Sequence, residues 1–363
     1  MKIPFLDLSI KDMKLKAELL AAVETVLDHG RFIHGPEHEQ FESTIADYCG
    51  RKHGVGVGSG TDALYLALRA LDIGPGDEVI TTPLTWVATT NAVVLCGATP
   101  VFVDIGEDLN IDANLIGAAV TSRTKAILPV HFTGQMCDME PIMTIGTDNG
   151  ITVVEDAAQA FGARDHDRIA GSFGRVACFS MNPMKVFNGY GEAGAVVTDD
   201  EAIADRLRSL RYAGTINKED CHETGINGRL DTLQAAMLLV NLRFLDAKIE
   251  ARRTVAAAYR EALAGVIDCA PEKDGFYHTY YCFTIFTERR EALREFLSDK
   301  GVETKIQHPL LMTRHTAYRH KFTADIPVAE RLVEKILCLP AHEEMTPEAI
   351  AYMASAIREF QGA

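Results

Sequence analysis

The sequence predicts an α/β protein whose larger part is a mostly parallel sheet flanked by helices, followed by a smaller α+β domain. Short apolar runs alternate with helical segments between residues 55 and 197, which is typical of parallel strands buried on both faces. Beyond about residue 245 this alternation stops. A chain of 363 residues is long enough for one major and one minor domain. We therefore expect a large domain over residues 1–245 and a small one over residues 246–363.

The N-terminal region is expected to be helical. Apolar residues recur at helical spacing from residue 13 to residue 27, and a break at residues 32–36 precedes a second helix that ends near residue 53. The segment around Phe5 has no partner within this scheme. Whether the extreme N-terminus packs on the small domain stays open.

Polar and aromatic residues gather at the ends of the predicted strands. The apolar runs that predict strands are residues 55–57, 78–82, 100–104, 126–130, 151–156, 176–179 and 195–197. Ligands of parallel α/β sheets bind at the carboxyl ends of the strands. The residues predicted at those ends are Thr85, Trp86, His131, Asp156, Gln159 and Ser180.

The second half of the chain is predicted to be helical around one long loop. Amphipathic helical patterns cover residues 201–211 and 229–260. The loop between them, residues 212–228, is long enough to suggest a function or an interface. In the small domain we expect strands at residues 277–286 and 302–307 and helices at residues 289–300 and 347–360.

Composition and charge exclude several classes of protein. The formal net charge is −15. A protein that binds a nucleic acid needs a concentrated basic face, and the sequence shows none. No apolar run has the length of a membrane span, and the N-terminus lacks a signal-peptide core, so a cytoplasmic enzyme or binding protein is expected. The eight cysteines include no close pair at metal-ligand spacing, which indicates reduced, mostly buried thiols and no bound metal.

Lys185 lies on a turn-rich loop between two predicted strands, with Pro183 and Gly189 beside it. Partial desolvation between buried strands favours the neutral, nucleophilic amine that Schiff-base chemistry needs. Most lysines are solvated surface charges, so the position alone leaves both readings open.

A phosphate site is predicted where the strand at residues 55–57 runs into Gly58, Ser59, Gly60 and Thr61 at the start of a helix. Glycines followed by hydroxyl residues leave backbone N–H groups exposed at the positive end of the helix dipole. An ordinary cap by the side chain of Ser59 or Thr61 is the alternative.

Three residues at the strand ends also have alternative explanations. Trp86, the only tryptophan, could stack on an aromatic ligand or lie in the core. The Asp156 carboxylate ends an apolar run and needs a partner, either a helix N-terminus or a bound cation. His131 is expected to be a hydrogen-bonded structural residue rather than a ligand.

Together these features predict a site for pyridoxal phosphate. That cofactor needs a lysine amine, a carboxylate that keeps its pyridine nitrogen protonated, a phosphate cup and usually an aromatic side chain over the ring. Lys185, Asp156, the turn at residues 58–61 and Trp86 would fill these four roles.

The sequence also resembles the DegT/DnrJ/StrS-type sugar aminotransferases, a family of fold-type I pyridoxal phosphate enzymes. The resemblance runs from Ile3 to Pro340. It is carried by GSGTDAL at 58–64, TWVAT at 85–89, VFVDI at 101–105, VEDAAQAFGA at 154–163, GEAGAVVTDD at 191–200 and GINGRLDTLQAA at 225–236. The family's fold implies a seven-stranded, mostly parallel sheet and a homodimer with shared active sites.

The resemblance implies a role for each cofactor residue. Lys185 would form the Schiff base and move the proton, and Asp156 would pair with the pyridine nitrogen. The remaining contacts would be Trp86 on the ring, Gln159 on the phenolic oxygen, and Gly60, Thr61, Ser180 and Asn227 of the partner subunit on the phosphate. Arg229 is implied for the amino donor's carboxylate and His308 for the sugar-nucleotide side of the cleft.

The implied reaction passes an amino group from L-glutamate, through pyridoxamine phosphate, to a keto group at C3 or C4 of a nucleotide-linked sugar. Its products would serve amino-sugar, surface polysaccharide or glycoside biosynthesis. The alternatives are a sugar dehydratase on the same fold, a cyclitol aminotransferase, and a catalytically idle sensor or regulator. Dehydratases of the family carry histidine in place of the lysine, so Lys185 argues against the first.

Overall fold

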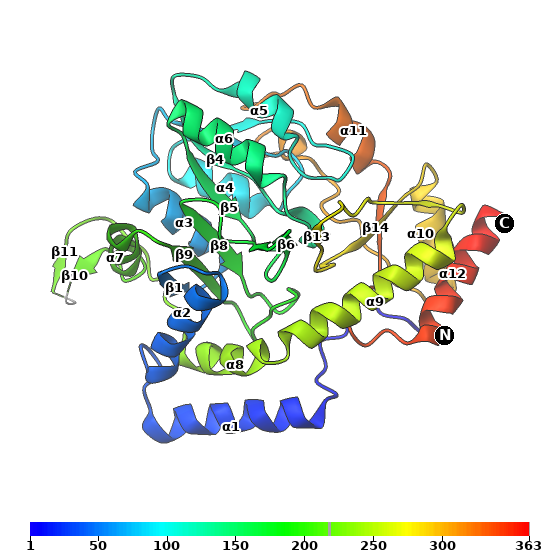
Figure 1. The fold of residues 1–363 in the computed structure, drawn as a ribbon, viewed down its shortest axis with the longest axis horizontal. Helices are drawn as coiled ribbons and strands as arrows, with labels where there is room; N and C mark the ends of the chain where they lie inside the picture. Colours follow the sequence, from blue (N-terminus) through cyan, green and yellow to red (C-terminus); the bar gives the residue numbers. More distant parts are fainter. Residues whose placement is uncertain (217–218, 363) are drawn as a thin grey trace.

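A seven-stranded sheet forms the centre of the large domain in the computed structural model, which describes residues 1–216 and 219–362 (Figure 1). The strand order is β1-β9-β8-β5-β4-β2-β3, and every neighbouring pair is parallel except the two that involve β9. The bounds are β1 His53–Val57, β2 Glu78–Thr81, β3 Thr99–Phe102, β4 Thr124–Leu128, β5 Thr152–Asp156, β8 Val176–Ser180 and β9 Gly194–Thr198. The predicted mostly parallel sheet is confirmed, and each strand begins within two residues of its expected position.

Helices cover both faces of this sheet, because successive side chains of a strand point to opposite faces. Ala126 and Leu128 of β4 belong to one buried cluster, while Ile127 belongs to the other. The first cluster packs against α3 (Gly60–Ala70), α4 (Val87–Leu95) and α7 (Glu201–Leu210). The second packs against α2 (Pro36–Tyr48), α5 (Ala113–Ala119), α6 (Met139–Asn149) and α8 (Thr232–Leu242).

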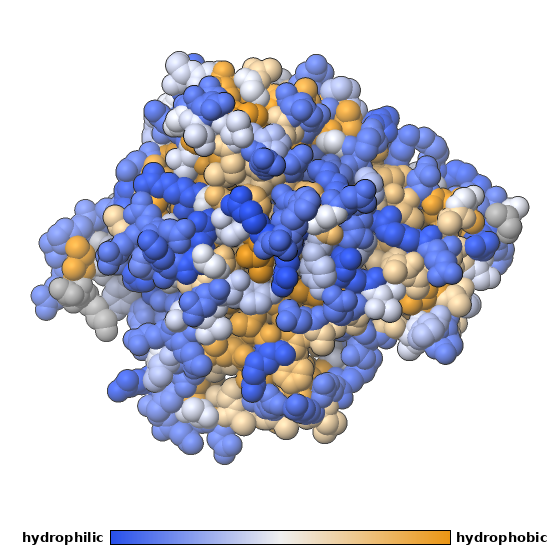
Figure 2. Space-filling view, viewed as in Figure 1, coloured by the Kyte–Doolittle hydropathy of each residue, from blue (hydrophilic) through white to orange (hydrophobic). Residues whose placement is uncertain are grey.

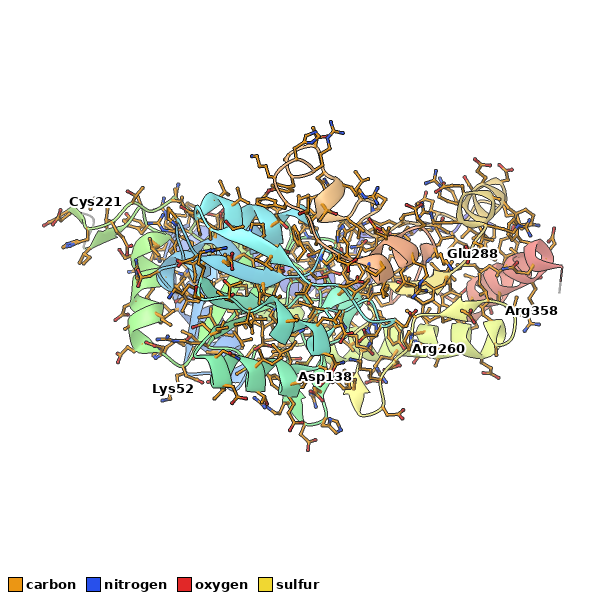
Figure 3. All side chains as sticks on the ribbon, turned by 90° about the horizontal axis from the view of Figure 1, so that it is seen from above. Lys52, Asp138, Cys221, Arg260, Glu288 and Arg358 are labelled. Carbon is orange, nitrogen blue, oxygen red and sulfur yellow. The ribbon has the colours of Figure 1, made fainter. Side chains whose placement is uncertain are left out.

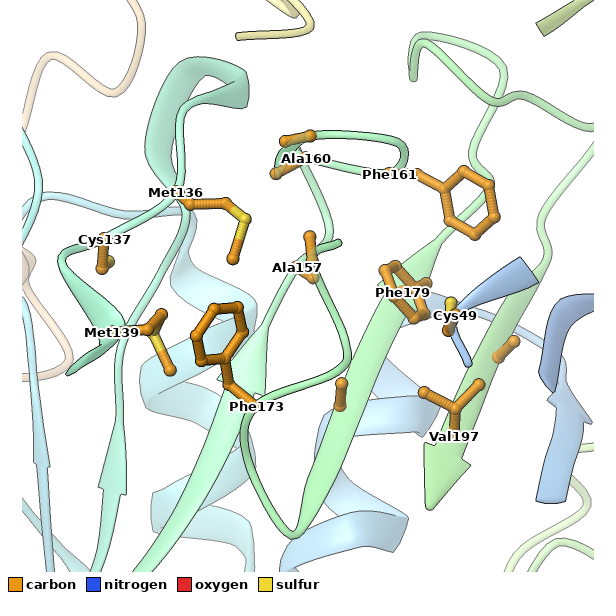
Figure 4. Close-up of a cluster of buried hydrophobic side chains, with 14 of the residues drawn as sticks. Cys49, Met136, Cys137, Met139, Ala157, Ala160, Phe161, Phe173, Phe179 and Val197 are labelled. Atoms are coloured by element: carbon orange, nitrogen blue, oxygen red, sulfur yellow. The ribbon is translucent and has the colours of Figure 1, made fainter. Parts of the chain in front are cut away.

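The aromatic part of the second cluster gathers around Phe179 of β8 (Figure 4). The Phe161 and Phe179 rings meet edge to face with centroids 5.0 Å apart, and the Phe161 ring stacks on Tyr48 at 4.9 Å. Such aromatic contacts add about 0.5–1.5 kcal/mol per pair beyond the area they bury. They fix the strand that ends at Ser180, directly before the lysine loop.

Two neighbouring acids on β5 have different surroundings because their side chains face opposite sides of the sheet. Asp156 faces α4, whereas Glu155 is fully buried on the other face. The Glu155 carboxylate accepts bonds from the N–H groups of Gly171 (2.8 Å), Phe173 (2.8 Å) and Gly174 (2.7 Å). Burial alone would raise the pKa of Glu155, but these bonds and the one from the His131 ring outweigh it and lower the pKa.

We expect Glu155→Gln to lower the free energy of unfolding by about 3 kcal/mol, because the new amide group meets backbone donors and the buried charge balance is lost. Urea unfolding followed by circular dichroism measures this change. The exposed acid Glu140 on α6 provides a matched control, and Glu140→Gln should be neutral. Equal stability of the two variants would contradict the structural role of Glu155.

The chain leaves the large domain along α9 (Leu245–Leu263). Leu245 and Ile249 pack in the large-domain core, while Val255 and Tyr259 pack in the core of the small domain. The helical pattern predicted at residues 229–260 is confirmed, and it is divided into α8 and α9, which are separated by Arg243 and Phe244. A kink there turns α9 toward the small domain.

The small domain has a three-stranded sheet in the order β12-β14-β15. Its elements are β12 Asp268–Cys269, β14 Phe283–Phe286, α10 Arg290–Asp299, α11 Pro327–Val333, β15 Ile336–Leu339 and α12 Pro347–Gln361. The expected strand at residues 302–307 is wrong, because this segment makes only isolated bridges from Val302 to Ile3 and from Lys305 to Cys338. The expected strand at residues 277–286 is shorter, and β13 (Phe276–Tyr277) pairs with β6 (Arg164–Asp165) of the large domain, which also pairs with β7 (Arg168–Ile169).

The extreme N-terminus lies on the small domain. Ile3 bridges Val302 and is buried in the small-domain core, and the Phe5 N–H donates to the Glu303 carboxylate at 3.1 Å. The chain then continues into α1 (Met13–His29), which packs on α8 at the lower edge of the molecule (Figure 1). Residues far apart in the sequence therefore join the two domains.

A short hairpin, β10 (Thr215–Ile216) and β11 (Asp220–Cys221), projects from the body beyond α7 (Figures 1 and 3). It lies within the loop expected at residues 212–228, of which residues 217–218 are outside the described ranges. Across the described ranges, no helix combines the length and apolar character that crossing a membrane requires.

Candidate active site

A cavity of about 580 Å³ lies at the carboxyl edge of the large sheet, between the two domains. Eight of the ten residues proposed from the sequence line it: Gly60, Thr61, Trp86, Asp156, Gln159, Ser180, Lys185 and His308. They meet there because β5 and β8 end at Asp156 and Ser180, and α3 and α4 begin beside them. Asn227 and Arg229 lie outside the cavity.

The start of α3 provides free backbone donors. Ser59 is the N-cap residue, and its hydroxyl accepts from the Asp62 N–H at 3.0 Å. Among the described residues the N–H groups of Gly60 and Thr61 have no acceptor. The turn is therefore both a helix cap and a candidate phosphate site, since the Ser59 cap leaves two other N–H groups for an anion.

Gly60 is needed for the shape of this cup. A Cβ at Gly60 would lie 2.6 Å from the Ser180 Cβ, a distance that real side chains do not reach. The absence of a side chain lets the helix N-terminus approach the end of β8. The Ser180 hydroxyl then lies beside the free N–H groups of α3.

Asp156 is buried, and α4 fixes its carboxylate. The Thr89 hydroxyl donates to Asp156 Oδ2 at 2.8 Å, and the Ala158 N–H donates to Oδ1 at 3.2 Å. The Thr85 and Thr89 hydroxyls lie 2.8 Å apart, so Thr85 extends this chain of bonds. Burial raises the pKa of Asp156, against the effect of these bonds and of Lys185. A cation placed at this carboxylate would stabilise its ionised form.

Gln159 has its amide orientation set by a neighbouring loop. Its Oε1 accepts from the Thr133 N–H at 3.0 Å, and Thr133 has a left-handed φ of 58°. An amide has a carbonyl acceptor and an NH₂ donor, so the Gln159 NH₂ remains for a ligand in the cavity. The His131 that precedes this loop is buried and bonded to Glu155 and to the Cys137 N–H, which confirms it as a structural residue.

The loop that carries Lys185 is closed by its own hydrogen bonds. The Lys185 N–H donates to the Asn182 carbonyl at 2.9 Å, and the Gly189 N–H donates to the Met181 carbonyl at 2.7 Å. The Asn182 amide donates to the Glu192 carboxylate at 2.7 Å. These bonds tie both ends of the loop together and hold Lys185 at the cavity wall.

The Lys185 amine lies 4.6 Å from the centroid of the Tyr281 ring. Burial lowers the pKa of Lys185 to about 8, against the attraction of Asp156. Tyr281 comes from the small domain and is fixed by a large-domain loop, since the Cys282 N–H donates to the Thr133 carbonyl at 3.1 Å. The lysine is therefore enclosed by groups of both domains.

Trp86 is the N-cap residue of α4 and has 58% of its surface exposed, so the core explanation for this residue is wrong. Its ring centroid lies 5.6 Å from that of His308. Burial, together with Lys185 and Lys305, lowers the pKa of His308 to about 3. His308 is therefore neutral at neutral pH.

Asn227 and Arg229 contact each other beside the end of β1. The Arg229 Nε donates to Asn227 Oδ1 at 2.8 Å, and the Arg229 guanidinium lies 4.6 Å from the Tyr212 ring centroid. The Gly58 N–H donates to the Gly228 carbonyl at 2.8 Å. Both side chains are thus held near the phosphate cup without lining the cavity of their own chain.

Sequence reasoning assigned no role to six polar residues that line the cavity: Thr89, Tyr281, Asn182, Glu192, Lys305 and Gln307. Thr89 carried a usable signal, because it lies four residues after Thr85 and so on the same helix face. Tyr281, Lys305 and Gln307 come from the small domain, where no motif marked them. Across the described ranges no group of three or more His, Cys, Asp or Glu side chains could hold a metal ion.

The residues fit pyridoxal phosphate by their own chemistry. The cup has two free N–H donors and a hydroxyl for a phosphate, and the carboxylate of raised pKa suits a protonated ring nitrogen. An amine of lowered pKa and an exposed indole complete the set.

A family model described as the DegT/DnrJ/EryC1/StrS aminotransferase family matches residues 13–358. The chain belongs to this family. Its members are pyridoxal phosphate-dependent aminotransferases, so the enzyme class and cofactor expected for this aminotransferase are confirmed, as is the fold-type I architecture.

Two curated relatives have different names. The UDP-N-acetyl-3-dehydro-alpha-D-glucosamine 3-aminotransferase of Acidithiobacillus ferrooxidans is 41% identical, over 98% of this chain and 97% of its own. A pleiotropic regulatory protein of Geobacillus stearothermophilus is 40% identical, over 99% of each chain. Among solved structures, this chain is similar to the crystal structure of S. venezuelae DesV in complex with a ketimine intermediate. The TM-score is 0.97 and the identity 41%, over 100% of this chain and 99% of the DesV chain.

Proposed function

We propose that this aminotransferase moves the amino group of L-glutamate to a keto group, at C3 or C4, of a nucleotide-linked sugar. The observation that carries the proposal is the single cavity that joins Lys185, Asp156 and the phosphate cup. The relative from Acidithiobacillus ferrooxidans, named for amination at C3 of a UDP-linked sugar, supports the acceptor class.

The residues of the cavity would divide the work of binding and proton transfer. Pyridoxal phosphate, when bound, supplies an electron sink for charge that develops on the substrate carbon. Gly60, Thr61 and Ser180 would hold its phosphate, and Trp86 would lie on its ring. Asp156, fixed by Thr89, would keep the ring nitrogen protonated.

Lys185 takes a proton from the donor carbon and returns protons to the reacting atoms, as a general base and acid. A pKa near 8 suits this task, because both forms of the amine are then present close to neutral pH. The loop bonds from Asn182 and Gly189 keep the amine within reach of the reacting carbon.

The test is a two-step transfer with purified holoenzyme. L-Glutamate should bleach the visible absorbance of the bound cofactor and release 2-oxoglutarate. After removal of glutamate, a UDP- or dTDP-linked 3-keto or 4-keto sugar should restore the absorbance and gain an amine, detected by mass spectrometry. No transfer to any of these ketones would sink the proposed acceptor class, and transfer to a keto-cyclitol alone would favour a cyclitol aminotransferase.

A catalytically idle regulator is the second candidate, because one relative is named as a regulatory protein. Retention of Lys185, Asp156 and the complete cup argues against it. A regulator would show no bleaching with L-glutamate even when saturated with cofactor.

The lowered pKa of Lys185 predicts how attachment of the cofactor depends on pH. The neutral amine is the reactive form, so uptake of pyridoxal phosphate by cofactor-free protein should speed up as pH rises and level off above about pH 8. Stopped-flow absorbance measures this rate. A rate that keeps rising toward the ordinary lysine pKa of about 10.4 would contradict the lowered value.

We also infer that two copies associate. Met13, Leu20 and Leu27 of α1 are exposed and spaced by seven residues, which places them on one helix face. Figure 2 shows further apolar surface over α8 and α1. A dimer would cover this surface and would bring Asn227 of the partner subunit toward the phosphate cup.

We expect Leu20→Glu to shift the protein toward monomers, because it places a charge in the apolar contact. Sedimentation velocity measures the distribution. Leu115 is also exposed but lies on α5, far from α1 (Figure 1), so Leu115→Glu is the control. A monomeric wild type would contradict the dimer.

A further inference from the structure

The lysines of this chain divide into two groups. The described residues include six partly buried lysines. Four of them form ion pairs with carboxylates: Lys248 with Glu343, Lys273 with Asp108, Lys300 with Glu359 and Lys335 with Glu288. The other two, Lys185 and Lys305, have no carboxylate within 4.0 Å among the described residues, and both line the active-site cavity. Burying a cation without a nearby anion costs free energy, and a bound anionic ligand would offset that cost.

Lys305 is held in place by the small domain. Its N–H donates to the Cys338 carbonyl at 3.1 Å, and its carbonyl accepts from the Cys338 N–H at 2.7 Å. The ammonium lies 5.9 Å from the centroid of the Phe5 ring. Since Cys338 is a buried residue of β15, these two bonds fix the backbone of Lys305 to the small-domain sheet.

The carboxylates that line the cavity already have partners. Asp156 is bonded to Thr89 and Ala158, and Glu192 is bonded to the Asn182 amide at 2.7 Å. His308 is neutral at neutral pH. When the Lys185 amine takes part in the reaction, the Lys305 ammonium is the positively charged side chain that remains in the cavity wall.

Gln307, two residues after Lys305, leaves a second group unsatisfied on the same wall. Its side chain is buried, and Gln307 Oε1 has no hydrogen-bond partner among the described residues. Its amide nitrogen lies 3.1 Å from the His308 ring nitrogen. A ligand with both an anionic group and an N–H or O–H donor would pair with the Lys305 ammonium and with Gln307 Oε1.

We propose that Lys305 binds a carboxylate of the amino donor. Arg229, which the resemblance implies for that role, lies outside the cavity of its own chain. The inference rests on the proposed function and names the subsite that selects an amino acid in the first half of the reaction. The donor must place its α-carbon at Lys185, and its α-carboxylate is attached directly to that carbon. The positive charge of Lys305 reaches the Lys185 amine electrostatically, whereas a neutral sugar ring offers no anion at that position.

The experiment measures binding without chemistry. Glutarate has the two carboxylates of glutamate but no amino group, so it can occupy the donor site of the pyridoxal phosphate-loaded enzyme without reacting. We expect Lys305→Met to raise the calorimetric Kd for glutarate about 10- to 100-fold, as for loss of a charged hydrogen bond. Lys305→Arg should restore most of the affinity, because it keeps the charge. Lys321→Met, at an exposed lysine outside the cavity lining, should bind like the wild type.

Kinetics then separate the donor from the acceptor. In Lys305→Met the apparent Kd for L-glutamate in the first half-reaction should rise, while the maximal rate and the KM for the keto sugar stay near wild type. Equal glutarate binding by Lys305→Met and wild type, or an increase confined to the acceptor KM, would overturn the assignment. Failure of the proposed function would look different, since wild type would then bind glutarate in a Lys305-dependent way but transfer no amine to a keto sugar.

Discussion

Replacing Lys185 with alanine is expected to lower the rate of the glutamate half-reaction by at least about 10,000-fold, because the variant loses both the attachment point of the cofactor and the proton carrier. The fold should survive, since the Lys185 backbone bond to Asn182 does not involve the side chain. Single-turnover absorbance measures the rate, and thermal unfolding checks the fold.

Lys185→Arg distinguishes the charge of this residue from its proton transfer. Arginine keeps a cation in the cavity but stays protonated, so the variant should be nearly as slow as Lys185→Ala. Added methylamine should restore part of the activity of Lys185→Ala by acting as a small base in the vacated space. An arginine variant with near wild-type rate would show that the positive charge, and not the neutral amine, is what the reaction needs.

Asp156→Asn is expected to slow the same half-reaction about 1,000-fold, the scale seen when one preorganised electrostatic group is removed from an active site. The amide matches the shape of the carboxylate and can still contact Thr89. It has no negative charge, so the ring nitrogen loses the group that keeps it protonated.

The absorbance of the bound cofactor as a function of pH tests this cause directly. In Asp156→Asn the titration of the ring nitrogen should move to lower pH than in wild type. Glu192→Gln is the matched control, because Glu192 is an acid of the same cavity that bonds to Asn182 instead. It should change the rate less than tenfold, and an equal effect of the two variants would mean that general cavity charge, and not contact with the ring, matters.

Much of the site was predictable from residues that are adjacent in the chain. The turn from Gly58 to Thr61, Asp156 at the end of β5 and Ser180 at the end of β8 each combine a local pattern with a strand end. Because parallel strands bring their carboxyl ends to one edge, predicting the strands placed these residues together. Lys185 follows the same logic, since it lies on the loop that leaves β8.

Other features of the site depend on contacts that no local pattern records. Tyr281 and Lys305 reach the cavity from the small domain, more than 90 residues after Lys185 in the sequence. Their position depends on the kink between α8 and α9, which the uniform helical pattern of residues 229–260 concealed. The segment at residues 302–307 was predicted as a strand from its pattern, but it bridges the N-terminus and β15 at single residues.

The sequence by itself determined the seven strands of the central sheet, the edge of the sheet at which a ligand binds, and the chemistry of the groups gathered there. Periodicity and strand ends are properties of neighbouring residues, so they can be read along the chain. The tertiary structure alone decided which groups lack a hydrogen-bond or ion-pair partner among the described residues: the Gly60 and Thr61 N–H groups, Gln307 Oε1 and the Lys305 ammonium. Whether a polar group has a hydrogen-bond partner depends on every element packed around it, and that packing exists only in the folded chain, where the two domains lie against each other.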